Sequence, residues 1–269
     1  MYTKKDIFDQ LSMIGAPRDS VVLFHSSLRL IGEIEGGGEG LLDALVEYFT
    51  AEGGLFCVPT HTWNNVGKRD RITLDLTKAE SNLGAFALIA AADKRGLRTE
   101  NPTHSVVIFG ERERALELSK NEASLDSPTA PEGVHGKLFS EGGYVLLAGV
   151  SQNKNTYLHA VDEMLVIPNR MAADKLRFTV KREDGEVVER EMYFYDEDFA
   201  GDVSLRFPKY ETAFRYYGAI TDGFLGDAPV QLCDARKMKE TVELIWKNSG
   251  GRDPLADEEP IAPRVYCRR

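Results

Sequence analysis

Two alternating patterns run through the first 170 residues. Short, uninterrupted apolar runs, typical of buried strands, occupy residues 20–24, 54–59, 106–109 and 144–150. Before and between them, apolar residues spaced three and four apart predict helices over 3–14, 41–49, 85–94 and 111–120. This repeated alternation predicts an α/β fold with three layers (α/β/α) around a mixed, largely parallel central sheet.

The pattern changes after residue 170. In residues 177–182 and 187–195, apolar and polar side chains alternate as in β-strands. The two segments are joined by Glu183-Asp-Gly-Glu, which is typical of a β-hairpin turn. Helices are predicted over 210–218 and 234–249, and the proline-containing tail is predicted to be loop. We expect a single domain over residues 1–269 that includes this C-terminal part.

Composition narrows the classes of partner. The 269 residues carry a formal net charge of −10 and a pI of about 5.1, which argues against nucleic acid because phosphate binding needs a basic face. The three cysteines have no CxxC spacing and indicate reduced thiols, with Cys57 in the core. No apolar segment resembles a signal peptide or is long enough to span a bilayer, so we expect a cytoplasmic protein.

Residues 155–163, Asn-Thr-Tyr-Leu-His-Ala-Val-Asp-Glu, combine a helix start with candidate catalytic side chains. With Asn155 as N-cap, Asp162 and Glu163 follow His159 by three and four residues and share its helix face. The helix N-terminus lowers an imidazole pKa, whereas a nearby carboxylate raises it. His159 is therefore a candidate general base. The alternative is an ordinary i,i+3 contact on a surface helix.

Polar residues also follow the other predicted strands, at the sheet edge where α/β folds bind ligands. His25-Ser-Ser follows the first strand, and Thr60-His-Thr-Trp follows the second. The glycine-rich segment 36–40 is either a source of free amides for a phosphate or carbonyl, or a flexible turn. The acidic segment 196–202 is either a solvated loop or a negatively charged wall for a polyamine.

Several ordered blocks carry a resemblance to one family. They are residues 25–32 with the glycines that follow, 54–60, Asn101-Pro-Thr-His-Ser, Ser127-Pro128, and 145–163. Together they make the chain resemble the aminoglycoside 3-N-acetyltransferases, well over residues 1–170 and more weakly beyond. The resemblance implies a cytoplasmic acyltransferase that moves an acetyl group from acetyl-coenzyme A to the 3-amine of an aminoglycoside, and hence antibiotic resistance. It also implies a fold distinct from that of GNAT acetyltransferases.

The resemblance assigns roles along the chain. Residues 1–170 would form the cofactor-binding and catalytic core, and 171–269 would contribute to the substrate cleft. His159 would be the general base, supported by an acid three residues on; that acid is usually Glu, but here it is Asp162, so Glu163 is the alternative support. Thr156, or an amide of residues 26–28, would stabilise the oxyanion. The family often has His where this chain has Asn101. This difference leaves undecided whether the acceptor pocket matches that of the resistance enzymes.

The resemblance also implies binding residues. Coenzyme A is expected at His25, Ser26, Ser27, Leu28, Arg29, Ile31, Gly32, Gly37, Thr60 and Ser105. The cationic amine is expected at Trp63, Asn64, Asp196, Glu197 and Asp198.

Other interpretations stay open. The chain could acetylate an amine that is not an antibiotic, or bind coenzyme A without turnover. A metal-dependent hydrolase would use His25, His61, His104 and His159, but no HxH or HExxH spacing supports it, and no metal is expected. Cys57 as an acetyl carrier is disfavoured by its apolar neighbours. Whether the chain forms a homodimer is left open.

Overall fold

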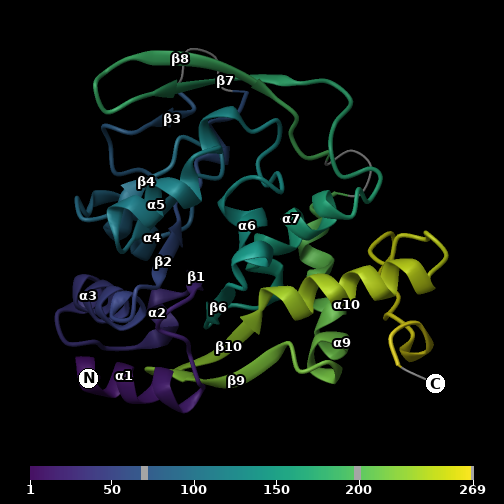
Figure 1. Cartoon of the computed structure of the whole chain (residues 1–269), viewed down its shortest axis with the longest axis horizontal. Helices are drawn as coiled ribbons and strands as arrows, with labels where there is room; N and C mark the ends of the chain where they lie inside the picture. Colours follow the sequence, from purple (N-terminus) through teal and green to yellow (C-terminus); the bar gives the residue numbers. More distant parts are fainter. Residues whose placement is uncertain (68–71, 197–200, 268–269) are drawn as a thin grey trace.

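The computed structural model describes residues 1–67, 72–196 and 201–267. Within them, a mixed sheet of seven strands has the spatial order β4-β5-β2-β1-β6-β10-β9 (Figure 1). Its strands are β1 (Val21–Ser26), β2 (Leu55–Pro59), β4 (Leu97–Arg98), β5 (Val106–Phe109), β6 (Tyr144–Ala148), β9 (Ile220–Leu225) and β10 (Ala228–Asp234). A smaller sheet contains β3 (Leu74–Asp75), β7 (Leu176–Lys181) and β8 (Val187–Met192).

The predicted α/β class and mixed sheet are confirmed, but the sheet is less parallel than expected. Strand β1 runs parallel to β2 and β6. The other neighbouring pairs, β4–β5, β5–β2, β6–β10 and β10–β9, are antiparallel. The crossover after β2 returns the chain as β4, and β5 then folds back between β4 and β2. The prediction assumed a simple strand–helix–strand crossover at this point.

Helices cover both faces of the large sheet, which gives the three layers predicted. Alternate side chains of β1 point to opposite faces: Val21 and Leu23 enter one hydrophobic core, and Val22 and Phe24 enter the other. One core packs against α1 (Lys4–Met13), α2 (Leu28–Ile31), α3 (Gly37–Thr50) and α4 (Ala85–Ala92). The other packs against α5 (Arg112–Ser119), α6 (Val134–Glu141), α7 (Tyr157–Met164), α9 (Glu211–Tyr216) and α10 (Ala235–Asn248).

Local sequence explains several element ends. Thr3 caps α1 and forms a capping box with Asp6, and Asp234 caps α10 by accepting a hydrogen bond from the Lys237 amide. Gly185, with a φ of 91°, closes the predicted hairpin between β7 and β8. The β9–β10 hairpin was not predicted, because Asp222 and its glycine neighbour interrupt the apolar pattern of β9.

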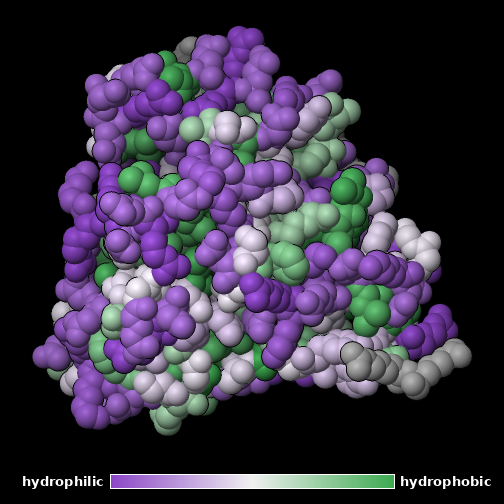
Figure 2. All heavy atoms as spheres, viewed as in Figure 1, coloured by the Kyte–Doolittle hydropathy of each residue, from purple (hydrophilic) through white to green (hydrophobic). Residues whose placement is uncertain are grey.

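The C-terminal third contributes to both sheets. Its strands β9 and β10 extend the large sheet beside β6, while the β7–β8 hairpin lies across one end of the molecule, at the top of Figure 1. In the described ranges, no helix is long and apolar enough to cross a membrane. Figure 2 shows a mainly hydrophilic face on which hydrophobic residues form small, separate groups.

Candidate active site

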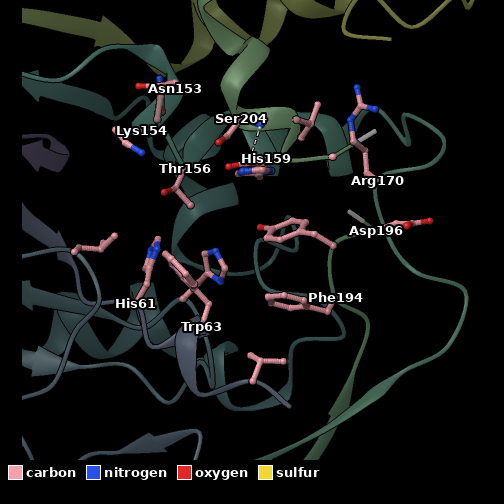
Figure 3. Close-up of a pocket in the computed structure, with 18 of the residues that line it drawn as sticks. His61, Trp63, Asn153, Lys154, Thr156, His159, Arg170, Phe194, Asp196 and Ser204 are labelled. Atoms are coloured by element: carbon pink, nitrogen blue, oxygen red, sulfur yellow. Dashed lines mark hydrogen bonds between the residues drawn. The ribbon is translucent and has the colours of Figure 1, made fainter. Parts of the chain in front are cut away.

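A cavity of about 600 Å³ lies where β1 and β2 end. His25 on β1 and His61 just beyond β2 line it, as do Thr156 and His159 at the start of α7. Figure 3 shows His159 and Thr156 across the cavity from His61 and Trp63. The other described lining residues are Val66, Leu83, His104, Asn153, Lys154, Asn155, Asn169, Arg170, Ala172, Phe194, Tyr195, Asp196, Gly201, Asp202, Val203 and Ser204.

His159 is held by packing against aromatic rings. Helix α7 buries Leu158 in the core, which leaves the next residue, His159, to face the cavity. The imidazole centroid lies 4.5 Å from the ring of Tyr195 and 4.8 Å from that of Phe207. No described residue forms a hydrogen bond with either ring nitrogen. Both nitrogens are therefore available to a ligand.

The predicted contact between His159 and Asp162 is wrong. Asp162 is 2 % exposed and accepts a hydrogen bond of 2.5 Å from Nε of Arg170. Arg170 also donates to both carboxylate oxygens of Asp253, over 2.8 and 2.9 Å. Buried carboxylates gain more from a guanidinium than from a neutral imidazole, and this decides the direction in which the Asp162 side chain points.

Glu163 does not contact His159 either. Its carboxylate accepts hydrogen bonds from the hydroxyls of Ser127 and Thr129 and from the Thr129 amide, the last over 3.2 Å. The Thr129 hydroxyl also lies 3.0 Å from that of Tyr195. Because Tyr195 packs on His159, Glu163 supports the surface on which the imidazole rests rather than the imidazole itself.

The helix start also differs from the prediction. The N-cap residue of α7 is Thr156, and its side chain makes no capping hydrogen bond. Asn155 instead donates from its amide nitrogen to Oε1 of Gln152, over 2.8 Å. Asn155 therefore closes the preceding 3₁₀ turn, η3 (Gln152–Lys154), rather than the helix.

All five histidines of the chain gather at the cavity. His25, His61, His104 and His159 line it, and the His135 ring lies behind, 5.9 Å from that of His61. Burial lowers the pKa to about 3 for His25 and His135, to about 4 for His159, and well below 6.5 for the other two. All five are therefore neutral at pH 7.

Two charged neighbours act on His159 in opposite directions. Burial has the largest effect and lowers the pKa of the imidazole; Asp202 raises it, and Arg170 lowers it. The Asp202 carboxylate accepts a hydrogen bond of 3.0 Å from the Ser204 amide at the start of η4 (Val203–Tyr210). Asp202 is thus the acid that favours the protonated form of His159.

The buried histidines make the fold sensitive to acid. Below about pH 6.5 the unfolded chain binds protons that folded His25 and His135, with pKa values of about 3, do not bind. Each should cost about 2 kcal/mol of stability between pH 7 and pH 5. Burial raises the pKa of Glu122 to about 7 and of Asp162 to about 6, so these acids act in the opposite sense and offset part of the loss. Burial lowers the pKa of His61, His104 and His159 as well, so the five histidines together outweigh these two acids, and urea unfolding should show lower stability at pH 5.

A variant of one histidine isolates this effect. His135→Gln removes a titrating ring that is 1 % exposed and does not line the cavity. The variant should lose about 2 kcal/mol less than the wild type between pH 7 and pH 5. Equal losses in the two proteins would show that His135 does not cause the acid sensitivity.

Of the residues expected to bind coenzyme A, His25 lines the cavity. Ser26, Ser27 and Leu28 are half-buried where β1 passes into α2, and Arg29 is exposed. The Ser27 amide donates to the Ala148 carbonyl over 2.9 Å, so this candidate oxyanion donor is already engaged.

The remaining expected coenzyme residues serve the fold in several ways. The Ile31 side chain is fully buried, and the hydroxyls of Thr60 and Ser105 are buried 3.0 Å apart. Gly32 has a φ of 87°, and a Cβ there would lie 2.3 Å from Oδ2 of Asp227, so only glycine fits. Gly37, the first residue of α3, also has a positive φ.

The residues expected to bind the amine are only partly brought together. Trp63 (41 % exposed) and Asp196 line the cavity. The Asn64 amide donates to Oδ1 of Asn82, and Asn64 is not among the described lining residues. Glu197 and Asp198 lie outside the described residues.

Sequence reasoning missed Arg170, Tyr195 and Asp202 as individual site residues. Nothing local marks Arg170, because its acidic partners are 8 and 83 positions away in the chain. Tyr195 ends the alternating segment of the predicted hairpin, and Asp202 ends the acidic segment. The rule that residues at the ends of predicted strands face a ligand, which pointed to His25 and His61, would also have pointed to Tyr195.

Cys57 is confirmed as a core thiol. Its side chain is fully buried, and burial raises the thiol pKa. The four histidines of the metal-dependent alternative do converge. Nevertheless, in the described part of the chain no group of three or more His, Cys, Asp or Glu side chains is arranged to hold a metal ion.

Comparison with solved structures finds the same fold in aminoglycoside acetyltransferases. A coenzyme A complex of AAC-IIIb aligns with a TM-score of 0.77 at 20 % identity, covering 93 % of this chain and 97 % of the other. AAC(3)-IVa, as a variant in complex with apramycin, aligns with a TM-score of 0.71 at 22 % identity, covering 99 % and 97 %.

Comparison of sequences points the same way. Aminoglycoside N(3)-acetyltransferase VII of Streptomyces paromomycinus is 25 % identical over 274 residues, covering 93 % of each chain. The prophage-derived YokD protein of Bacillus subtilis, named as aminoglycoside N(3')-acetyltransferase-like, is 24 % identical over 178 residues, covering 60 % of this chain and 64 % of its own length. The family model described as aminoglycoside 3-N-acetyltransferase matches residues 23–245. The chain therefore belongs to the aminoglycoside 3-N-acetyltransferase family, as its sequence blocks indicated.

Proposed function

We propose that the protein transfers an acetyl group from acetyl-coenzyme A to the 3-amine of an aminoglycoside, with His159 as general base. One observation carries this proposal: a neutral imidazole without a hydrogen-bond partner among the described residues faces a cavity of about 600 Å³ in a chain of this family. A base must be unprotonated and within reach of the group that loses the proton, and His159 meets the first condition at pH 7.

The proposed reaction is direct attack by the amine on the thioester. His159 accepts the proton that the amine loses, and Asp202 stabilises the imidazolium that results. The packing of His159 against Tyr195 and Phe207 fixes the direction of the ring. Thr156, on the same wall, is the candidate donor to the developing oxyanion. His159 then returns the proton to the departing thiolate.

The coenzyme is proposed to lie along residues 25–32 and the start of α3. Arg29 is an exposed cation suited to a phosphate. The Gly37 amide at the start of α3 donates to the Ile34 carbonyl over 2.9 Å, so the contribution proposed for α3 is the positive end of its helix dipole rather than that amide. A relative of the same fold was solved with coenzyme A, which supports this part of the proposal.

The acceptor is proposed to enter beside Asp196, Asp202 and Trp63. Carboxylates attract a polycationic amine and retain it by pairing. The described lining also carries two cations, Lys154 and Arg170. This balance of charge favours, as a second candidate, an acceptor with fewer amines than an aminoglycoside.

Release of free thiol from acetyl-coenzyme A tests the proposal. The purified protein would be assayed with apramycin, gentamicin, simple diamines and monoamines, and heat-denatured protein would be the control. We expect release with at least one aminoglycoside. Release with other amines alone would keep the acetyltransferase and change the acceptor. No release with any amine would contradict the proposed function.

A further inference from the structure

His61 is a buried polar side chain to which the mechanism above gives no role. It is 3 % exposed and lines the cavity. Its Nε2 is buried without a hydrogen-bond partner, and Nδ1 bonds to no described residue. A buried polar group without a partner costs about 1–3 kcal/mol, so native proteins rarely leave one unless water or a ligand engages it.

The backbone around His61 is rigidly held. The Thr60 and Thr62 amides donate to the carbonyls of Ser105 and Thr103, over 2.7 and 2.9 Å. The His61 carbonyl accepts a hydrogen bond of 2.7 Å from the Asn82 amide. The imidazole itself packs on the His104 ring, with centroids 4.2 Å apart. A side chain fixed in this way is pre-organised, which is what stabilisation of a transition-state charge requires.

The position of His61 relates it to the proposed chemistry. It points into the cavity from the wall opposite His159 and Thr156 (Figure 3). A thioester held between these walls would have Thr156 on one side of its carbonyl and His61 on the other. Because the imidazole is neutral at pH 7, it can donate one N–H hydrogen bond without placing a positive charge beside the cationic acceptor.

We propose that His61 is a further catalytic residue, which donates a hydrogen bond to the thioester carbonyl oxygen of acetyl-coenzyme A. This inference rests on the proposed function. The amine nitrogen bonds to the carbonyl carbon, and the π electron pair moves to the oxygen, where His61 and Thr156 stabilise the negative charge. The carbonyl then reforms, the carbon–sulfur bond breaks, and the proton that the amine loses passes through His159 to the thiolate.

Two substitutions of similar size separate donation from packing. His61→Leu removes the donor, whereas His61→Asn keeps a side-chain N–H. We expect His61→Leu to lower kcat about 100- to 1,000-fold, the usual effect of losing one oxyanion donor, with KM for acetyl-coenzyme A changed less than about twofold. His61→Asn should recover at least about tenfold of that loss, which a merely structural role would not predict.

His135→Gln is the matched control. His135 is also buried, its two ring nitrogens have no partner, and it belongs to the same histidine cluster, but it does not line the cavity. This variant should keep kcat within about threefold of the wild type. A similar loss in His135→Gln and His61→Leu would overturn the assignment, because it would trace the effect to packing of the cluster.

A measurement on bound acetyl-coenzyme A does not depend on turnover. A hydrogen bond from His61 should lower the infrared stretching frequency of the thioester carbonyl in the wild-type complex, and His61→Leu should remove that shift. If the wild type turns over and His61→Leu has a normal kcat, the role of His61 is overturned but the proposed function stands. Equal carbonyl frequencies in the two complexes would have the same consequence. Failure of the wild type to bind acetyl-coenzyme A would overturn the proposed function and the inference with it.

Discussion

Replacing His159 by alanine should lower kcat for acetyl transfer by about a hundredfold or more, the scale expected when a general base is lost. The substitution removes the only described imidazole that lies on α7 and faces the cavity. Coenzyme A binding should stay close to that of the wild type, because the residues proposed to hold it belong to other elements. Steady-state kinetics and titration with coenzyme A would separate the two effects.

Variants that neutralise three acidic residues near His159 test what supports the imidazole. Asp202→Asn should lower kcat, because Asp202 is the acid that favours protonated His159. Glu163→Gln should act more weakly, through the hydrogen bonds that link Glu163 to Thr129 and Tyr195. Asp162→Asn should lower the free energy of unfolding but change kcat little. Near-normal turnover in His159→Ala would remove His159 from the mechanism, whatever the acids do.

Replacing Arg170 by leucine should lower the free energy of unfolding by about 3–5 kcal/mol, the cost of leaving a buried charge without its partner. The Arg170 and Asp162 side chains are only 5 % and 2 % exposed. The guanidinium also binds Asp253, so it joins helix α7 to the C-terminal segment. Unfolding in urea at pH 7 measures this loss.

A surface ion pair supplies the control. Arg177 and Glu191 are 66 % and 63 % exposed, and Arg177→Leu should cost less than about 1 kcal/mol. Adding Asp162→Leu to Arg170→Leu should recover much of the stability, because the uncompensated buried charge is then gone. A loss below about 1 kcal/mol in Arg170→Leu alone would show that the buried pair does not stabilise the fold.

Much of the fold followed from local pattern. Short apolar runs marked β1, β2, β5 and β6, and polar residues after strands marked His25 and His61, because neighbouring parallel strands end at one edge of a sheet. Helical spacing placed His159 on α7. These features depend on residues close together in the chain, and the sequence displays them directly.

The rest depends on contacts between distant segments. Helical spacing placed Asp162 and Glu163 on the same face as His159, but Arg170 and Thr129 determine where their carboxylates point. The antiparallel course of β5 depends on β4, a strand of two residues with no clear pattern of its own. The spacing of apolar and polar residues along the chain indicates neither the direction of a buried carboxylate nor the direction of a strand.

The proposed function requires the cavity to transfer an acetyl group to an amine. The most direct test incubates the protein with acetyl-coenzyme A carrying an isotopic label in its acetyl group, together with an aminoglycoside, and weighs the product by mass spectrometry. We expect an aminoglycoside heavier by one labelled acetyl group, with the label on the 3-amine, and almost none of this product with His159→Ala. Release of labelled acetate with an unchanged aminoglycoside, and with simple amines unchanged in parallel incubations, would contradict the proposed function.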